Sequence, residues 1–237
     1  MKLLAGTSGF SYKEWKGPFY PEKLRADEML RFYASRLPTV EINNTFYRLP
    51  RAEQLREWRA RVPATFRFAI KAPRRITHVK RLADCGADVE YLLNALRELE
   101  PLLGSILFQL PPFQRCDLPR LAAFAEQLPA DCRAAFEFRH ASWFDDAVFA
   151  LLAARNFALV LSETDESDPA NLPWTADWAY LRLRKTEYTD AELARWLERL
   201  AAAKLEEAQV FFKHEDEAKG PLLAEAFLSR YSSASGS

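Results

Sequence analysis

A carboxylate that alternates with aliphatic residues along a short strand is the first sign of chemistry in this chain. In the stretch TVEINNTFYRLP, residues 39–50, Val40 and Ile42 share one face of an expected strand, and Glu41 and Asn43 share the other. Burying an ionised carboxylate is costly unless it is paired or hydrogen-bonded. The pattern therefore indicates that Glu41 has either a charged partner or a functional role.

Polar side chains recur in the same alternation on later segments, mostly near the C-terminal end of each segment. With Glu41 and Asn43 they form a set expected to face one axis: Lys71, Gln109, Glu137, Arg139, Arg182, Arg184 and Lys213. The C-terminal rim of parallel strands is where barrel enzymes build their active sites. Two carboxylates would face five cations there, and this positive excess favours an anionic ligand such as a carboxylate, phosphate or sulfate.

These residues suggest roles without fixing a reaction. Glu41 and Glu137 are candidates for acid–base catalysis, because two carboxylates across a barrel mouth can give and take protons. Equally, each carboxylate could only orient an arginine or a lysine. Lys71 is a candidate catalytic amine, since a desolvated lysine beside cations can form a Schiff base, although plain anion binding is the simpler role. A salt-bridge network that only fills the barrel is the remaining alternative.

Loop residues after the strands extend the candidate site. Asn43 and Gln109 would orient polar groups of a ligand, and His78 is a candidate proton donor or a residue that structures its loop. Aromatic residues at the same rim could stack on a sugar or a base: Trp15, Phe19, Tyr20, Phe46, Tyr47 and Trp143.

Metal and cofactor motifs are lacking in the sequence. His78, His140 and His214 show neither HxH nor HExxH spacing, and no GxSxG or dinucleotide fingerprint occurs. His214 is expected to face outward because it alternates with Lys213. We expect a site without metal or cofactor, and a mixed set of Glu41, Glu137 and His78 is the one metal alternative.

Segments with strand character alternate with helical segments at about 30 residues per unit. The strands are expected over residues 3–7, 39–43, 66–71, 105–110, 133–139, 158–163, 178–184 and 209–214. Helices are expected over residues 28–36, 51–61, 87–99, 118–128, 145–155, 189–204 and 218–231. The polar, proline-bearing stretch 165–177 occupies the place of a crossover helix between strands six and seven.

Regular alternation implies parallel strands joined by right-handed crossovers. Eight units favour an α/β fold that closes into a single (β/α)8 TIM-barrel-like domain, with one crossover helix weak or missing, over an open doubly wound sheet. The domain is expected to span residues 1–231, and residues 232–237 are expected to form a flexible tail.

Composition narrows the cellular setting. The chain has 237 residues, and its 33 basic residues equal its 33 acidic ones, so net charge gives no support to nonspecific binding of nucleic acid or membranes. Three widely spaced cysteines, Cys85, Cys116 and Cys132, are expected to be free thiols. The sequence lacks a signal-peptide pattern and a transmembrane stretch, and a cytoplasmic protein is expected.

Several loop motifs together resemble one family. GTSGFSYKEWKGPFYP, TVEINNTFYRLP, FAIKAPRRITHVKRL, LFQLPPF and AAFEFRHASW resemble, in this order, the DUF72 (YecE-like) family up to about residue 160. The resemblance implies a TIM-barrel-like fold and no established reaction. Proposed similarity of that family to endonuclease IV-type barrels makes nucleic acid an alternative substrate.

The C-terminal third departs from the family pattern. Many members carry YLRLHG on strand seven, where this chain has YLRLRK, so Arg184 stands in place of a histidine. The last strand usually ends in an FNN-like segment, and here it reads FFKHEDEAKGP. By this resemblance the mouth has lost a histidine and an amide and has gained cations.

Three hypotheses follow for the function. The first is a barrel enzyme, a hydrolase or lyase, acting on a small anionic molecule bound by Lys71, Arg139, Arg182 and Lys213. The second is a nucleic-acid binder or phosphodiesterase that uses the basic mouth and its aromatic rim. The third is a ligand-binding barrel without turnover. The sequence indicates no oligomeric state.

Overall fold

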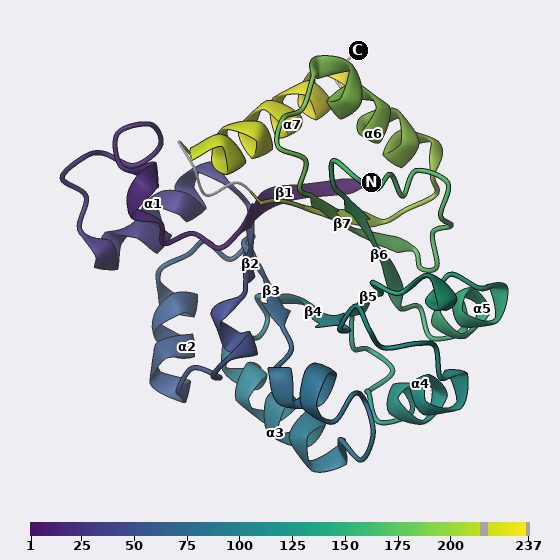
Figure 1. Cartoon of the computed structure of the whole chain (residues 1–237). Helices are drawn as coiled ribbons and strands as arrows, with labels where there is room; N and C mark the ends of the chain where they lie inside the picture. Colours follow the sequence, from purple (N-terminus) through teal and green to yellow (C-terminus); the bar gives the residue numbers. More distant parts are fainter. Residues whose placement is uncertain (214–217, 236–237) are drawn as a thin grey trace.

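The chain closes into an eight-stranded parallel barrel in the computed structural model, which describes residues 1–213 and 218–235 (Figure 1). Each strand pairs with its neighbours in the sequence, and β1 pairs with β8 to close the ring. The strands are β1 (Lys2–Ser8), β2 (Thr39–Ile42), β3 (Arg67–Lys71), β4 (Leu103–Gln109), β5 (Ala134–Glu137), β6 (Ala158–Glu163), β7 (Trp178–Leu183) and β8 (Glu207–Phe212). The predicted (β/α)8 fold is confirmed.

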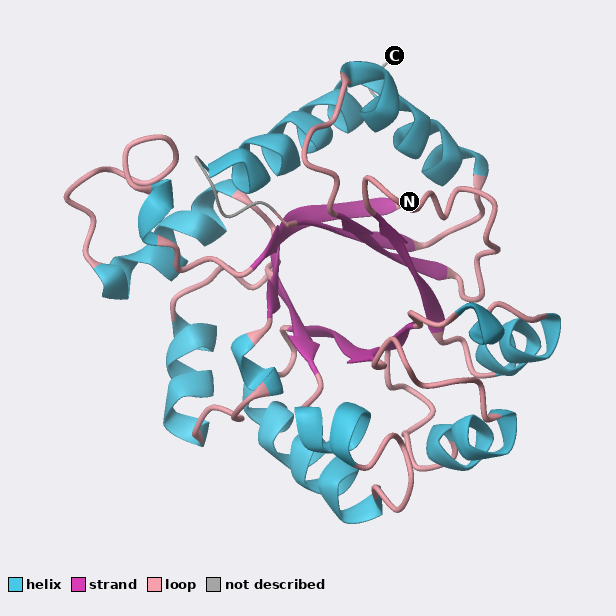
Figure 2. Cartoon of the chain, in the orientation of Figure 1, coloured by secondary structure: helices cyan, strands magenta, loops and turns pink. Residues whose placement is uncertain are grey.

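Helices form a ring outside the strands, as Figure 2 shows. They are α1 (Met29–Arg36), α2 (Ala52–Ala60), α3 (Gly86–Leu96), α4 (Leu118–Ala125), α5 (Asp146–Ala154), α6 (Asp190–Ala202) and α7 (Lys219–Ser235). α7 continues past Tyr231, where the predicted helix ended, into the stretch expected to be a tail. The expected outward orientation of His214 concerns a residue outside the described ranges.

The ring has a gap between β6 and β7. Residues 164–177, all of which the structure describes, contain no helix, in agreement with the predicted loop. The hydroxyl of Thr175 accepts a hydrogen bond from the amide of Leu159 at 2.8 Å and donates one to the carbonyl of Phe157 at 2.7 Å. The guanidinium of Arg199, on α6, lies 4.5 Å from the ring centre of Trp174. Side-chain contacts thus hold this loop where a helix would otherwise pack.

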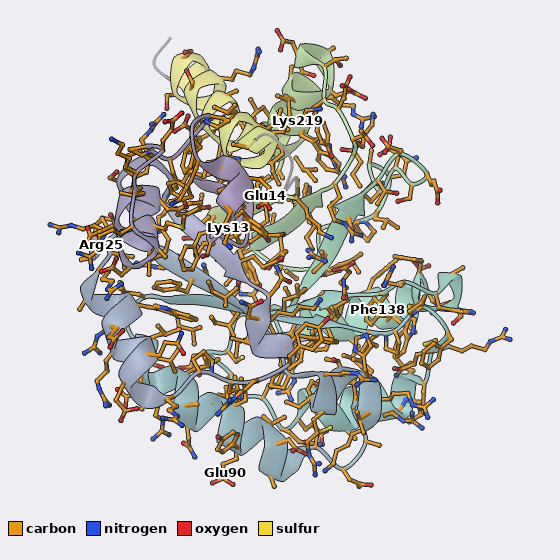
Figure 3. The ribbon with its side chains drawn as sticks, turned by 60° about the vertical axis from the view of Figure 1, so that its left-hand side comes forward. Lys13, Glu14, Arg25, Glu90, Phe138 and Lys219 are labelled. Carbon is orange, nitrogen blue, oxygen red and sulfur yellow. The ribbon has the colours of Figure 1, made fainter. Side chains whose placement is uncertain are left out.

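Aromatic residues on the outward faces of the strands bind the helices to the barrel. Phe68 of β3 stacks on Trp58 of α2 with ring centres 6.1 Å apart, and Phe108 of β4 meets Phe124 of α4 edge-on with ring centres 5.2 Å apart. Burial of each such side chain contributes about 1.5–3 kcal/mol. Figure 3 shows Arg25 and Glu90 projecting from the periphery, whereas Phe138 lies within the fold.

The barrel interior is layered along its axis. At the N-terminal end Gln209 accepts from Ser105 at 2.6 Å and donates to Glu207 at 3.0 Å, and Arg133 donates to Glu207 at 2.6 Å. Above these polar groups lies an interior cluster of mostly apolar side chains: Ala69, Leu107, Ala135, Ala158, Val160, Trp178, Tyr180 and Phe211. The polar residues at the C-terminal end form a separate layer above that cluster.

A close approach of β1 to β2 fixes how Ser8 and Glu41 lie relative to each other. A Cβ atom on Gly6 would lie 1.9 Å from the carbonyl oxygen of Thr39 and 2.9 Å from the hydroxyl of Tyr33. That hydroxyl accepts from the amide of Thr7 and donates to the carbonyl of Thr39, each at 2.9 Å. Only glycine leaves room for this bridge, which fixes the register that places Ser8 beside Glu41.

Two general features complete the fold. Cys85 is buried, Cys116 and Cys132 are half-buried, and all three are free. Among the described residues, no helix combines the length and the apolar character needed to cross a membrane. The division into one domain and a tail remains a prediction.

Candidate functional site

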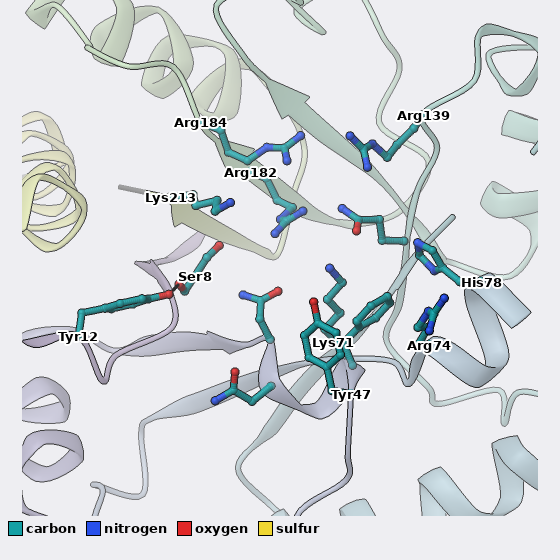
Figure 4. Close-up of a pocket in the computed structure, with 14 residues that line it drawn as sticks. Ser8, Tyr12, Tyr47, Lys71, Arg74, His78, Arg139, Arg182, Arg184 and Lys213 are labelled. Carbon is teal, nitrogen blue, oxygen red and sulfur yellow. Dashed lines mark hydrogen bonds between the residues drawn. The ribbon is translucent and has the colours of Figure 1, made fainter. Parts of the chain in front are cut away.

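A cavity of about 780 Å³ opens at the C-terminal ends of the strands. Figure 4 shows the side chains that line it, which come from both halves of the barrel. They are Ser8, Tyr12, Asn43, Asn44, Phe46, Tyr47, Lys71, Arg74, His78, Gln109, Arg139, Arg182, Arg184 and Lys213. The cavity is thus lined by seven of the nine residues expected to face the axis, and the other two, Glu41 and Glu137, lie beneath its floor.

Arg182 joins these two carboxylates across the barrel. Its Nη2 donates to Oε1 of Glu41 at 2.9 Å, and its Nη1 donates to Oε2 of Glu137 at 2.7 Å. The three side chains are 4%, 0% and 1% exposed, in the order Arg182, Glu41 and Glu137. One guanidinium therefore provides the shared counter-charge of two buried carboxylates from β2 and β5.

Glu41 has a full set of hydrogen bonds besides its ion pair. It accepts from the hydroxyl of Ser8 at 2.7 Å, the amide of Asn43 at 3.0 Å and the hydroxyl of Tyr180 at 2.6 Å. Burial alone would raise the pKa of Glu41, but the charge of Arg182 and these hydrogen bonds outweigh it and lower the pKa to about 2. Glu41 is therefore ionised at neutral pH.

Glu137 is held in the same way. It accepts from the amide of Gln109 at 2.9 Å and from Nη2 of Arg184 at 3.4 Å, in addition to Arg182. Burial opposes ionisation, but the two arginines lower the pKa of Glu137 below its ordinary value. Arg184 also donates to the hydroxyl of Ser162 at 2.6 Å.

These saturated, ionised carboxylates are poorly placed for the predicted acid–base chemistry. Every oxygen of Glu41 and Glu137 already accepts from the protein, and neither residue lines this cavity, although Glu137 lines a neighbouring one that shares Arg139 and Arg184 with it. The geometry favours the alternative in which both carboxylates orient arginines, Arg182 above all.

Acid will remove the stabilisation that the ionised Glu41 provides. Its pKa is about 2 in the folded state and 4.5 without the fold, so its contribution is fully present above about pH 4.5 and is lost as pH falls through about 2. At 1.36 kcal/mol per pKa unit the loss amounts to about 3 kcal/mol. Urea unfolding at a series of pH values will show this decline, and it will be shallower in Glu41→Gln. The exposed-residue control Glu90→Gln should keep the original slope; equal slopes in all three proteins would contradict the assignment.

Four cations of the cavity have no carboxylate partner. Within the described part of the chain, Lys71, Arg74, Arg139 and Lys213 form neither an ion pair nor a hydrogen bond through their charged groups. Arg74, Arg139 and Lys213 are exposed, whereas Lys71 is half-buried, with Nζ 4.6 Å from the ring centre of Phe46. Burial and the charge of Arg182 lower the pKa of Lys71 to about 8.

His78 lies at the same rim, on a short π-helical turn at Arg75–Val79. Its Nδ1 is 2.9 Å from the hydroxyl of Thr77, and its ring meets the ring of Phe46 edge-on at 4.8 Å. Burial and the charges of Lys71, Arg74 and Arg139 lower the pKa of His78 below its ordinary 6.5. The imidazole is therefore neutral at pH 7, which suits a proton acceptor better than the predicted donor.

Only part of the expected aromatic rim lines the cavity. Tyr47 is 82% exposed there, beside Phe46. Trp143, predicted to contact a ligand, is instead buried: it stacks on Phe138 at 4.5 Å and donates to the carbonyl of Gln114 at 2.8 Å. Trp15, Phe19 and Tyr20 are buried as well, in the core near α1. Burial of these large rings, which stabilises the loops, removes them from the rim.

Sequence reasoning missed some residues of the site. Tyr180 stands two residues before Arg182 on the same strand, so strand alternation could have placed it on the inward face. Ser8 pairs with Glu41 across β1 and β2, a contact that requires the register. Among the described residues, no cluster of three or more His, Cys, Asp or Glu side chains is arranged to hold a metal. Glu41 and Glu137 bind Arg182 instead.

Comparison with known sequences identifies relatives. The family model described as "Protein of unknown function DUF72" matches residues 4–236. UPF0759 protein YecE of Escherichia coli (strain K12) is 35% identical over 116 residues, which cover 48% of this chain and 43% of YecE. UPF0759 protein YunF of Bacillus subtilis (strain 168) is 32% identical over 133 residues, which cover 53% of this chain and 47% of YunF. The matched stretch thus spans less than half the length of these curated relatives.

Solved structures share the fold. A DUF72 family protein from Thermotoga maritima MSB8 superposes over the full length of both chains with a TM-score of 0.83 and 25% identity. One from Enterococcus faecalis V583 covers 96% of this chain and 95% of its own, with a TM-score of 0.78 and 20% identity. The superposition on the 3-keto-D-glucoside 4-epimerase YcjR of E. coli covers 98% of this chain and 100% of YcjR, with a TM-score of 0.55. The two sequences are 13% identical, which indicates a shared fold only.

Proposed function

Since this chain belongs to the DUF72 family and folds as a (β/α)8 barrel, we propose that it is an enzyme that binds a small anionic molecule at the C-terminal mouth. The ligand carries a phosphate or carboxylate group. The observation that carries the proposal is the set of four cavity cations, Lys71, Arg74, Arg139 and Lys213, that lack a counter-charge among the described residues.

The charge balance of the cavity supports an anionic ligand. Six cations line it, namely Lys71, Arg74, Arg139, Arg182, Arg184 and Lys213, and two carboxylates lie beneath it, so the described residues give an excess of four positive charges. Like charges held together in a partly desolvated cavity repel one another, and a bound anion offsets that repulsion. Because Arg182 is already neutralised, the excess lies at the rim, where a ligand would enter.

The rim also offers donors of the right geometry. Arg139 and Arg184 approach each other across one side of the cavity, and Lys71 points into it from the opposite wall (Figure 4). Guanidinium groups bind carboxylates and phosphates through paired hydrogen bonds. We assign anion binding to Arg139, Arg184 and Lys213, and proton transfer to Lys71 and the neutral His78. Glu41 and Glu137 act as positioning residues for Arg182 in this scheme.

Calorimetric titration with inorganic phosphate tests the binding step. Phosphate should bind saturably, and Arg139→Gln should weaken binding by about 1.5–3 kcal/mol, which is roughly tenfold to a hundredfold, because a hydrogen bond to a charged group is lost. The matched control is Arg31→Gln, which removes an exposed arginine of α1 and should leave the affinity unchanged.

Two outcomes would contradict the proposal. One is the absence of saturable binding of phosphate and of small carboxylates. The other is an equal affinity in the original protein and in Arg139→Gln.

Nucleic acid is the second candidate, and the exposed ring of Tyr47 beside the cavity cations favours it, because such a ring can stack on a base. A single-stranded oligonucleotide serves as the second probe. Its affinity would have to fall steeply with salt concentration for this candidate to replace the small anion.

A further inference from the structure

Lys71 differs from the other cations of the cavity. It lies at the end of β3, is half-buried, and its amine contacts the face of Phe46 rather than an acceptor. The two nearby carboxylates are already occupied: Glu41 by Ser8, Asn43, Tyr180 and Arg182, and Glu137 by Gln109 and the two arginines. The amine of Lys71 is therefore left facing the cavity with no acceptor among the described residues.

The surroundings of Lys71 favour its uncharged form. Burial and the positive charges of Arg182 and Lys213 lower its pKa to about 8, against the opposite influence of Glu41 and Glu137. At pH 7 roughly one molecule in ten then carries a neutral amine, whereas an ordinary lysine has far fewer. A neutral, unpartnered amine in a cavity that favours anions is equipped for attack on a carbonyl group.

We propose that Lys71 is a covalent site, whose amine forms an imine with the carbonyl group of an anionic aldehyde or 2-oxo acid. This inference rests on the proposed function, because the cavity cations must hold the anionic end of the molecule while the carbonyl carbon meets Nζ. It narrows the substrate class from anions in general to anions that carry a carbonyl group.

The step balances without a further reactant. The lone pair of the neutral amine forms the carbon–nitrogen bond, and the carbonyl π electrons move to oxygen. A proton passes from nitrogen to that oxygen to give a carbinolamine. The hydroxyl then takes up a second proton, the one that the Lys71 ammonium gave to His78 when the amine became neutral, and leaves as water, while the nitrogen lone pair closes the double bond of a protonated imine. Neutral His78, whose ring also packs against Phe46, is the group that can accept and return a proton at this rim.

Reductive trapping tests the assignment. The protein is treated with limiting glyoxylate, an aldehyde with a carboxylate, in the presence of cyanoborohydride, and labelled peptides are identified by mass spectrometry. Lys71 should be labelled at least about tenfold faster than the exposed Lys23, because the cavity cations hold the carboxylate of glyoxylate beside the Lys71 amine, and the lowered pKa of Lys71 increases the neutral fraction of that amine. The rate should rise as pH passes through about 8, and inorganic phosphate should slow it.

Matched reagents and variants isolate the cause. Acetaldehyde, which lacks the carboxylate, should show a smaller preference for Lys71 over Lys23 than glyoxylate does, and phosphate should not reduce that preference. Lys71→Arg keeps the positive charge but lacks the amine, so the fast-labelled site should disappear.

Two outcomes overturn the inference and separate it from the proposed function. If calorimetry shows phosphate binding but Lys71 is labelled no faster than Lys23, the imine is wrong and the anion site stands. If labelling is fast but phosphate neither binds nor slows it, the anion site is wrong, and with it the substrate class inferred for Lys71.

Discussion

Replacing Arg182 by methionine will lower the free energy of unfolding by about 3–5 kcal/mol at pH 7. The substitution removes the guanidinium that bridges Glu41 and Glu137 at 2.9 and 2.7 Å, and it leaves two carboxylates that are 0% and 1% exposed without their shared counter-charge. Methionine fills a similar volume, so the loss of stability will reflect the missing charge and not a newly created cavity. Urea unfolding followed by circular dichroism measures it.

The pH dependence of Arg182→Met gives an independent readout. Without the arginine, Glu41 has no counter-charge against its burial, whereas Glu137 keeps Arg184, so the pKa of Glu41 will rise above its unfolded value and the variant will become more stable as pH falls through that raised value. The original protein has the opposite slope in acid. The triple variant Glu41→Gln, Arg182→Met, Glu137→Gln removes all three charges and should recover most of the lost stability. A cost below about 1 kcal/mol for Arg182→Met, or no recovery in the triple variant, would show that the bridge contributes little.

Gly6→Ala will destabilise the protein by about 3 kcal/mol or more, at the upper end of the cost of overpacking. The new methyl group would lie 1.9 Å from the carbonyl oxygen of Thr39, which belongs to the backbone and cannot turn away. It would also displace the hydroxyl of Tyr33 and break the hydrogen bonds through which that hydroxyl joins β1 to β2. Thermal and urea unfolding will measure the loss.

A matched glycine provides the control for that prediction. Gly86 begins α3, and a Cβ there would meet only the end of the Gln127 side chain, at 3.9 Å. Gly86→Ala should therefore be neutral or stabilise the protein by up to about 1 kcal/mol. Similar losses in both variants would mean that the contact between β1, β2 and Tyr33 is not what makes Gly6 necessary.

The fold was predictable because period-two alternation is a local property of the sequence. Residues 158–163 form β6 with the expected bounds, and most other elements differ from expectation by one or two residues at their ends. β5 ends at Glu137 rather than residue 139, because Phe138 and Arg139 leave the ladder for the rim loop. Inward orientation of Glu41 and Arg182 followed from the same alternation.

Other features of the site depend on distances between side chains of different strands, which the alternation along one strand does not predict. That Arg182 binds Glu41 and Glu137 together, leaving Lys71 unpaired, depends on side-chain reach across the barrel. The burial of Trp143 could not be predicted for another reason. A tryptophan in a loop can stack on a ligand or pack on the core, and the residue type does not distinguish these two positions. In the structure, Trp143 stacks on the buried ring of Phe138, which lies two residues beyond Phe136.

The bridge at Arg182 also has a consequence for how the chain folds. Its hydrogen bonds reach back 45 residues to Glu137 and 141 residues to Glu41, so the bond to Glu41 closes a long loop of the chain. Contacts of such sequence separation are slow to form, because the entropy of loop closure must be overcome first. Until β7 joins the sheet, the earlier strands hold two inward carboxylates without this counter-charge. The arginine therefore couples completion of the ring to neutralisation of its interior, and the bridge can form only once β2, β5 and β7 belong to one sheet.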